Sequence, residues 1–229
     1  MMQILQKHRP SLTIRAGHLA RQLIEKEGLH AQQIDIVPGA AGGPKGIGIQ
    51  GLDQAIFGDF FAQAPQRRTV IGSSIGSWRF ASILAWGAKE GTERLSNLYT
   101  NLSFHKKMSR QEVAHICQGM LIDLIQGQEQ QLVDHPDYHL AVISIIAQHI
   151  FQSDLALPLL ASVAGIIGSN ALGRKHNRLF MQRVISQPSS GQQFKVEDDF
   201  VTHYQSLNRD NAIPWLMASA SIPGVMAAI

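Results

Sequence analysis

The chain has 229 residues, 20 basic and 17 acidic side chains, a formal net charge of +3 and 45% apolar residues. This composition is typical of a globular protein, and without basic runs it argues against a nucleic-acid partner. The single Cys117 excludes an intrachain disulfide. The N-terminal stretch MMQILQKHRPSLTIRAG lacks the apolar segment of a signal peptide. We therefore expect a cytoplasmic protein, with peripheral membrane contact as a further possibility.

The first part of the chain predicts an amphipathic helix and then a crossover. Residues 11–28 carry apolar side chains at helical spacing. Residues 33–37 (QIDIV) predict a short strand, residues 44–61 a helix and residues 68–72 a second strand. A strand-helix-strand unit of this kind places its two strands parallel in one sheet.

The rest of the chain alternates helical and extended patterns, which indicates an α/β fold. The pair Ser109 and Glu112 predicts a capping box at the start of a helix. The apolar stretch 155–168 predicts a buried helix, or otherwise a segment that touches lipid. The expected elements are helices at 90–103, 109–126, 155–168 and 211–220, strands at 138–146, 177–185 and 200–207, a turn at 135–137 and a loop at 187–193.

A tight turn between a strand and a helix holds the strongest candidate for a catalytic residue. After the β-branched run Thr69-Val70-Ile71 comes Gly72-Ser73-Ser74-Ile75-Gly76, followed by a helical pattern up to Gly87. Strand, Gly-x-Ser-x-Gly turn and helix form a nucleophile elbow, in which Ser74 is the nucleophile and Gly72 and Gly76 permit close packing. Taken alone, the pentapeptide fits an ordinary Gly/Ser turn equally well.

A second glycine-rich loop precedes the first crossover helix. Gly42, Gly43 and Gly46 predict exposed N–H groups at a helix N-terminus, with Lys45 beside them, and such a loop binds anions. A nucleotide-binding domain is one alternative. The Walker A pattern fails because Pro44 precedes Lys45 and Gly46 follows it. The literal G-x-G-x-x-G match at residues 46–51 falls inside the helical pattern rather than at its start.

An oxyanion hole fits the loop better than a phosphate site. The loop and Ser74 follow successive strands of one parallel crossover, so both emerge at the same edge of the sheet. N–H donors held there stabilise the anion that forms during acyl transfer, and losing one donor typically costs about 100- to 1000-fold in rate. The residues alone therefore predict a serine acyl hydrolase.

Together, Gly42-Gly43-Pro44-Lys45-Gly46 and Gly72-Ser73-Ser74-Ile75-Gly76 resemble the patatin-like phospholipase family, bacterial branch. The stretches LDQAIFGDF and NAIPWLMASASIPGVM extend the resemblance from about residue 33 to the C-terminus. It implies a three-layer α/β sandwich with a mainly parallel central sheet flanked by helices. It also implies a lipid or other acyl-ester substrate and no metal or organic cofactor. The implied site residues are Ser74 as nucleophile and Ala41, Gly42, Gly43, Lys45 and Gly46 as the oxyanion hole, with Ala41 replacing the family's first glycine.

One departure from the family concerns the catalytic base. The family uses a Ser–Asp dyad whose aspartate belongs to an Asp-Gly motif shortly after an Ala-Ser-x-x-x-Pro stretch. Here Ala218–Pro223 is present, but none of the ten aspartates precedes glycine. We therefore expect a single domain over residues 1–229 that is incomplete at its C-terminus, with the aspartate beyond the chain. The alternative is a catalytically impaired or non-catalytic lipid-binding fragment of the same fold.

Substitutes for the base within the chain are weak candidates. Asp154 and His203 would give a Ser-Asp-His order, but nothing in their spacing marks them. His135 and His139 are four residues apart, but Pro136 stands where a zinc-protease helix needs glutamate. We interpret both histidines as turn or surface residues, and no metal site is predicted.

Overall fold

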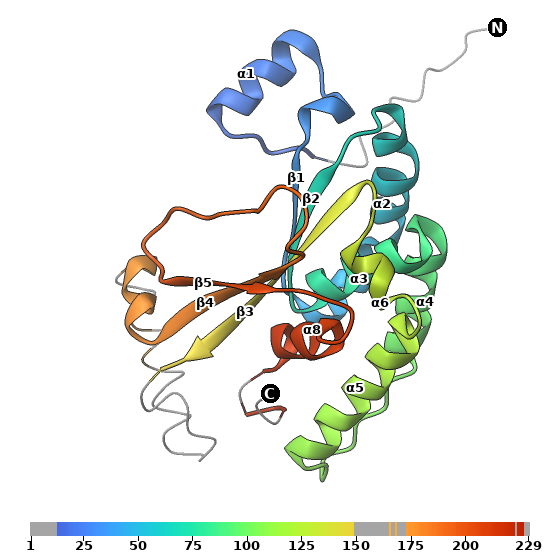
Figure 1. Cartoon of the computed structure of the whole chain (residues 1–229), viewed down its shortest axis with the longest axis vertical. Helices are drawn as coiled ribbons and strands as arrows, with labels where there is room; N and C mark the ends of the chain where they lie inside the picture. Colours follow the sequence, from blue (N-terminus) through green and yellow to red (C-terminus); the bar gives the residue numbers. More distant parts are fainter. Residues whose placement is uncertain (1–12, 149–164, 166–167, 169–172, 223, 227–229) are drawn as a thin grey trace, which may run out of the picture.

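The computed structural model describes residues 13–148, 165, 168, 173–222 and 224–226. Within them the chain has the predicted α/β fold: a five-stranded, mostly parallel sheet flanked by helices, consistent with a three-layer sandwich (Figure 1). The strands are β1 (Ile36–Gly39), β2 (Arg68–Ser73), β3 (Tyr138–Ala147), β4 (Met181–Gln187) and β5 (Thr202–Ser206), and they lie in this order across the sheet.

The helices lie before, between and after the strands, and most of them stand between β1 and β3. The α-helices are α1 (His18–Glu27), α2 (Gln50–Gln54), α3 (Ile75–Trp86), α4 (Ala88–Thr100), α5 (Arg110–Ile125), α6 (Glu129–Val133) and α8 (Ala212–Ala220). Shorter or tighter helical turns are η1 (Ala31–Gln33), η2 (Gly43–Ile49), η3 (Ala55–Phe60), η4 (Phe61–Gln63) and η6 (Arg174–Leu179). No described helix has the combined length and apolarity that crossing a membrane requires.

The predicted crossover is confirmed, because β1 and β2 pair in parallel with Gly39 opposite Gly72. Strand β3 continues the parallel arrangement on the other side of β2, with Ile143 opposite Ser73. Strand β4 then reverses direction against β3, and β5 pairs in parallel with β4. The carboxyl ends of β1, β2 and β3 therefore meet at one edge of the sheet.

The crossover helix expected at 44–61 forms, but it is not a regular α-helix. It begins as the 3₁₀ helix η2, continues through the five residues of α2 and then widens into the π-helical turn η3. Pro44, Gly46, Gly48 and Gly51 have low α-helical propensity, which accounts for an irregular first half. The segment still returns the chain to the start of β2.

Several expected elements shift. The expected helix 11–28 begins only at His18, and no residue of α1 is buried. The strand expected at 177–185 is displaced to β4, because the 3₁₀ turn η6 occupies its first residues. The stretch 155–168 lies, except for residues 165 and 168, outside the described residues.

The remaining second-half predictions hold with small changes at their ends. The capping box is confirmed: the Glu112 N–H donates to the Ser109 Oγ at 3.2 Å, and the Ser109 N–H donates to the Glu112 carboxylate at 2.7 Å. The helices expected at 90–103 and 211–220 appear as α4 and α8, and the strand expected at 200–207 as β5.

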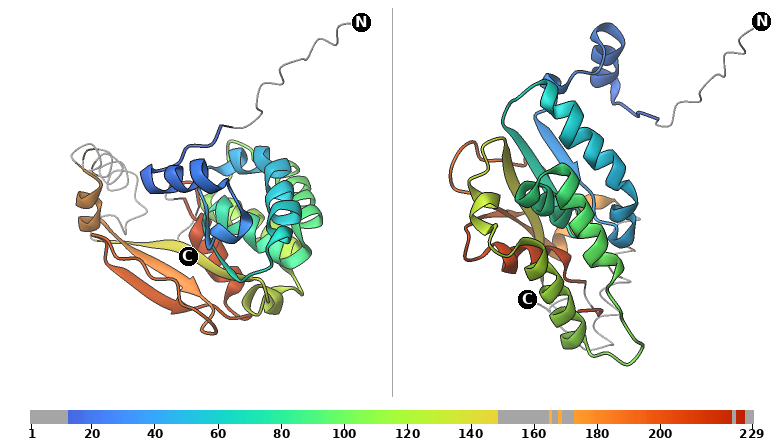
Figure 2. Two further views of the ribbon diagram at one scale, coloured as in Figure 1. Left: turned by 90° about the horizontal axis from the view of Figure 1, so that it is seen from above. Right: turned by 90° about the vertical axis from the view of Figure 1, so that its right-hand side faces the viewer.

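The main core lies between the sheet and the helices that follow β2. Buried Val70 and Leu140 of the sheet share one apolar cluster with Leu84 of α3, Leu121 of α5 and Leu216 of α8. Figure 2 shows helices α2 to α5 gathered on one side, with β4 and β5 extending away from them. The core thus fixes α3, α5 and α8 around the carboxyl edge of the sheet.

A smaller cluster covers the opposite face of the sheet. Ile71, Ala141 and Ile185 from three neighbouring strands contact Phe194 and Val196. Both covering residues belong to the connection between the parallel strands β4 and β5. This connection crosses the face without an α-helix among the described residues and shields the back of β2 from solvent.

Candidate active site

Ser74 has the most unusual backbone of the described residues. Its φ of 54° and ψ of −128° make it the one non-glycine residue of the described chain with positive φ. A conformation of this kind costs on the order of 1–3 kcal/mol and persists only where the surroundings impose it. Ser74 stands directly after β2 and caps α3. The strand, turn and helix of a nucleophile elbow are therefore confirmed as structure.

The two flanking glycines are required by close backbone contacts. A Cβ atom on Gly72 would overlap the backbone of Gly76 and Ser77, and one on Gly76 would overlap the carbonyl of Gly39 at the end of β1. Any larger residue at either position would push β1, β2 and α3 apart. The glycines thus hold the elbow against the loop that follows β1.

The same packing brings the glycine loop beside the elbow. Ala41, Gly42 and Gly43 line one cavity together with Ser74, as the crossover topology predicted. Gly43 has a φ of 54°, which favours glycine at that position, and it is the first residue of η2. Gly43 and Ile75 each begin a helix, so their N–H groups lack an acceptor within it and are available to an anion.

Two predicted oxyanion residues lie elsewhere. Gly46 is buried: a Cβ atom there would come within 2.9 Å of the Ile75 side chain and 3.3 Å of Arg79 Cδ, so the glycine permits η2 to pack on α3. Lys45 is exposed, and its Cβ lies beside Gly42 without contributing to the cavity wall. Of the predicted loop residues, Ala41, Gly42 and Gly43 face the cavity and Lys45 and Gly46 do not.

A buried ion pair joins α2, which follows the glycine loop, to α3, which follows the elbow. The Arg79 guanidinium of α3 donates to the Asp53 carboxylate of α2, with Nε at 2.7 Å, and both side chains are buried. Removing one partner of such a pair leaves an uncompensated buried charge. The pair therefore fixes the crossover helix, and the loop before it, relative to the elbow helix.

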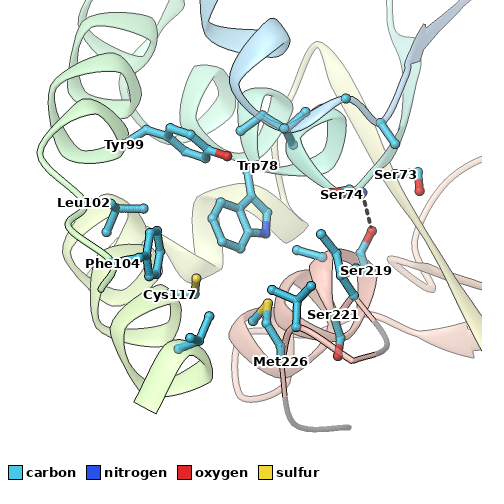
Figure 3. Close-up of a pocket in the computed structure, with 18 residues that line it drawn as sticks. Ser73, Ser74, Trp78, Tyr99, Leu102, Phe104, Cys117, Ser219, Ser221 and Met226 are labelled. Atoms are coloured by element: carbon cyan, nitrogen blue, oxygen red, sulfur yellow. Dashed lines mark hydrogen bonds between the residues drawn. The ribbon is translucent and has the colours of Figure 1, made fainter. Parts of the chain in front are cut away.

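The cavity has a volume of about 740 Å³ and a mainly apolar wall (Figure 3). Ser74 lies at one side, and Trp78, Phe104 and Met226 surround the space in front of it. The complete lining described is Ala41, Gly42, Gly43, Ser73, Ser74, Ile75, Trp78, Tyr99, Leu102, Phe104, Val113, Cys117, Ser219, Ala220, Ser221, Ile222, Val225 and Met226. The cavity size and apolar wall suit a small-molecule ligand with a hydrocarbon portion.

Ser219, near the end of α8, links the elbow to β3 through hydrogen bonds. The Ser74 N–H donates to the Ser219 Oγ at 2.9 Å, and the Ser219 hydroxyl donates to the Ile143 carbonyl of β3 at 2.6 Å (Figure 3). The Ser77 hydroxyl donates to the Ser74 carbonyl at 2.7 Å. Sequence reasoning did not assign Ser219 a role, although it is the serine of the Ala-Ser-x-x-x-Pro stretch.

Tyr99 and Cys117 give the cavity a neutral polar side. Burial raises the pKa of the Tyr99 phenol, and the nearby Cys117 raises it further. Burial also raises the pKa of the Cys117 thiol. The Tyr99 hydroxyl lies beside Gly43, with 3.6 Å from it to the position of an added Gly43 Cβ. At neutral pH, Tyr99 is therefore a protonated hydrogen-bond donor next to the proposed oxyanion loop.

None of the described residues that line the cavity is an aspartate, glutamate or histidine. His203 lies on β5 with its Nε2 2.7 Å from the Gln182 Oε1, away from the cavity, while Asp154 lies outside the described residues. His135 is in the predicted turn. The interpretation of His139 as a turn or surface residue is wrong. It is buried in β3 beside Gln187, and burial lowers its pKa, an effect partly opposed by the bond to Gln187.

Comparison of the chain with models of known protein families, with curated proteins and with solved structures found no match. A strained serine, two sets of free helix N-terminal N–H groups and an apolar cavity meet at one sheet edge. This arrangement can hold an ester carbonyl next to a hydroxyl and an acyl chain in the space beyond it. The described residues hold no group of three or more metal-ligating side chains placed to bind an ion.

Proposed function

We propose that the chain is a serine acyl hydrolase of patatin-like type that cleaves lipid acyl esters, with Ser74 as nucleophile. The observation that carries the proposal is the strained backbone of Ser74 on the wall of the apolar cavity. Strain at a residue beside a ligand-sized cavity is a mark of function rather than of stability. The lipid substrate rests on the cavity wall and on the resemblance to patatin-like phospholipases.

The reaction follows from the positions of the groups. The Ser74 Oγ attacks the ester carbonyl, and the N–H groups of Gly43 and Ile75 stabilise the oxyanion that forms. The proton lost by Ser74 passes to the leaving alkoxide, which departs as the alcohol. Water then attacks the acyl-serine ester, the carboxylic acid is released, and a proton from the water returns to the Ser74 Oγ. Tyr99 adds a neutral donor on the loop side. Lys45, which lies outside the cavity wall, favours the negative charge of the oxyanion through its positive charge and makes no direct contact with it.

No described residue of the cavity wall is assigned as the base that removes the serine proton, because none is an aspartate, glutamate or histidine. Serine is a weak nucleophile without an adjacent base, so slow turnover is expected of the chain as it stands. A rate limited by hydroxide instead of a protein base rises about tenfold per pH unit without a plateau. A plateau near neutral pH would place a base within the chain and would contradict this expectation.

A second function is favoured by one observation, the lack of an aspartate, glutamate or histidine among the described lining residues. In that case the cavity binds a lipid acyl chain without cleaving it. A protein of this kind would bind a fluorescent fatty-acyl probe equally well before and after Ser74→Ala. The two functions therefore differ in what Ser74 contributes.

Hydrolysis of p-nitrophenyl esters of increasing acyl length tests the proposal. We expect the rate to rise from the acetate to medium-chain esters, because each added methylene in the apolar cavity contributes about 0.8 kcal/mol. Ser74→Ala should remove the activity, whereas the exposed Ser190→Ala, on the loop after β4, should keep it. Equal rates in the parent and Ser74→Ala, together with tight probe binding, would support the binding function instead.

A further inference from the structure

The mouth of the cavity carries apolar side chains that are exposed to solvent. Phe104, Ile222 and Val225 line the cavity and yet are 50%, 53% and 52% exposed. They come from two segments far apart in the sequence, the connection between α4 and α5 and the residues after α8. Together with Lys106 and Lys107 they are called the rim below.

The rim is positively charged as well as apolar. Lys106 and Lys107 are exposed, and neither forms an ion pair within the described part of the chain. Arg110 follows at the start of α5, and Lys45 adds a further cation beside Gly42. The nearest acidic residue along the chain, Glu112, is engaged in capping α5.

The exposed apolar surface of α1 has a different charge pattern. Leu19 of α1 is 79% exposed, but Arg21 pairs with Glu25 and Lys26 with Glu27 along the same helix. The helix therefore has balanced charge. It also lies at the opposite end of the molecule from the first turn of α5 (Figure 1). The α1 surface thus lacks the excess positive charge of the rim.

We propose that the rim docks on an anionic lipid bilayer, so that Phe104 and its apolar neighbours enter the interface and lysines 106 and 107 contact the head groups. Exposed aromatic and aliphatic side chains bordered by lysines are the elements of interfacial membrane binding. This inference rests on the proposed function, since a rim at the cavity mouth would place the lipid ester directly before Ser74.

Flotation with lipid vesicles tests the inference. The protein is used as Ser74→Ala, so that hydrolysis does not alter the vesicles, and these contain phosphatidylcholine alone or mixed with phosphatidylglycerol. We expect binding to the mixed vesicles that weakens at high salt, because the rim charges are exposed. The double change Lys106→Gln and Lys107→Gln should weaken it on the order of tenfold, and Phe104→Ala by a similar factor.

Matched changes on α1 serve as controls. Leu19→Ala and Lys26→Gln replace exposed residues at the other end of the molecule and should leave vesicle binding unchanged. Rim variants that bind as tightly as their parent would overturn the proposal. So would salt-independent binding to both vesicle types, or a loss caused by Leu19→Ala. A dimer that dissociates on Phe104→Ala, without vesicle binding, would assign the rim to a second copy of the chain.

The outcomes also separate this inference from the proposed function. Hydrolysis of a soluble short-chain ester needs Ser74 but no membrane. The double change Lys106→Gln and Lys107→Gln, made with Ser74 intact, should therefore retain it, because neither lysine lines the cavity. Failure of vesicle binding with intact ester hydrolysis would overturn the rim proposal alone. Vesicle binding without any Ser74-dependent hydrolysis would overturn the proposed reaction alone.

Discussion

The two ends of β2 differ in whether their polar groups are paired within the protein. At its start, the buried Arg68 guanidinium donates to four backbone carbonyls at 2.9 to 3.3 Å, those of Ala31, Ile34, Ala64 and Gln66. It also lies over the Phe61 ring at 4.2 Å. At its end, Ser74 has a strained backbone beside free helix N-terminal N–H groups.

The difference separates a structural end of the strand from a functional one. At Arg68, polar groups that burial would otherwise leave unpaired are satisfied by the protein itself, so the arrangement stabilises the fold. At Ser74, the donors face a cavity, and within the described residues the Ser74 hydroxyl makes no hydrogen bond. Groups left available beside a cavity are available to a ligand. Changes at the two ends should therefore affect different properties.

The largest expected effect on stability is at the structural end. Arg68→Met should lower the free energy of unfolding by about 3–5 kcal/mol, because it leaves several buried carbonyls without donors. Urea unfolding followed by circular dichroism measures it. Arg67→Met, at the exposed neighbour, is the matched control and should change stability by less than about 0.5 kcal/mol. A loss of less than about 1 kcal/mol in Arg68→Met would contradict a stabilising role for the start of β2.

Next in size is the elbow glycine. Gly76→Ala places a methyl group against the Gly39 carbonyl and should lower the free energy of unfolding by about 2 kcal/mol. It should also slow any reaction at Ser74, since β1 and its loop move away from the elbow. Gly119→Ala in α5 meets no atom within 4 Å and should raise stability by about 1 kcal/mol. The same effect at both glycines would refute the close-contact argument.

The smallest expected effect on stability is that of Ser74→Gly. It is informative because replacing a residue by glycine usually lowers the free energy of unfolding, and here we expect an increase. Ser74→Gly should raise the free energy of unfolding by about 1 kcal/mol, since glycine adopts positive φ without strain. Ser96→Gly, inside α4, should lower it by about 0.5 kcal/mol. Thermal unfolding of both variants gives the two values. Destabilisation by Ser74→Gly would mean that the backbone at Ser74 is not strained.

Local patterns in the sequence predict much of the site. The run Thr69-Val70-Ile71 and the spaced glycines predict strand, turn and helix, and chain connectivity then places the elbow and the glycine loop at one sheet edge. These features depend on short-range sterics and on the handedness of crossovers. The structure adds the reason for the glycines: Gly72 contacts the backbone at the start of α3, and Gly76 contacts the backbone at the end of β1.

Other features depend on contacts that no local pattern reveals. Ser219 lies 145 residues from Ser74 and contacts it only because α8 packs on β3. The buried positions of Arg68 and His139 follow from tertiary packing around polar side chains, which periodicity alone assigns to the surface. Likewise, the reversal of β4 against β3 is set by pairing across the sheet.

The most direct test of the central claim, that Ser74 is a strained nucleophile facing the cavity, is labelling with a fluorophosphonate followed by mass spectrometry of the peptides. We predict one adduct, located on Ser74, which is absent in Ser74→Ala and retained in Ser190→Ala. An adduct located on another residue, equal labelling of Ser74→Ala, or no adduct on Ser74 would contradict it.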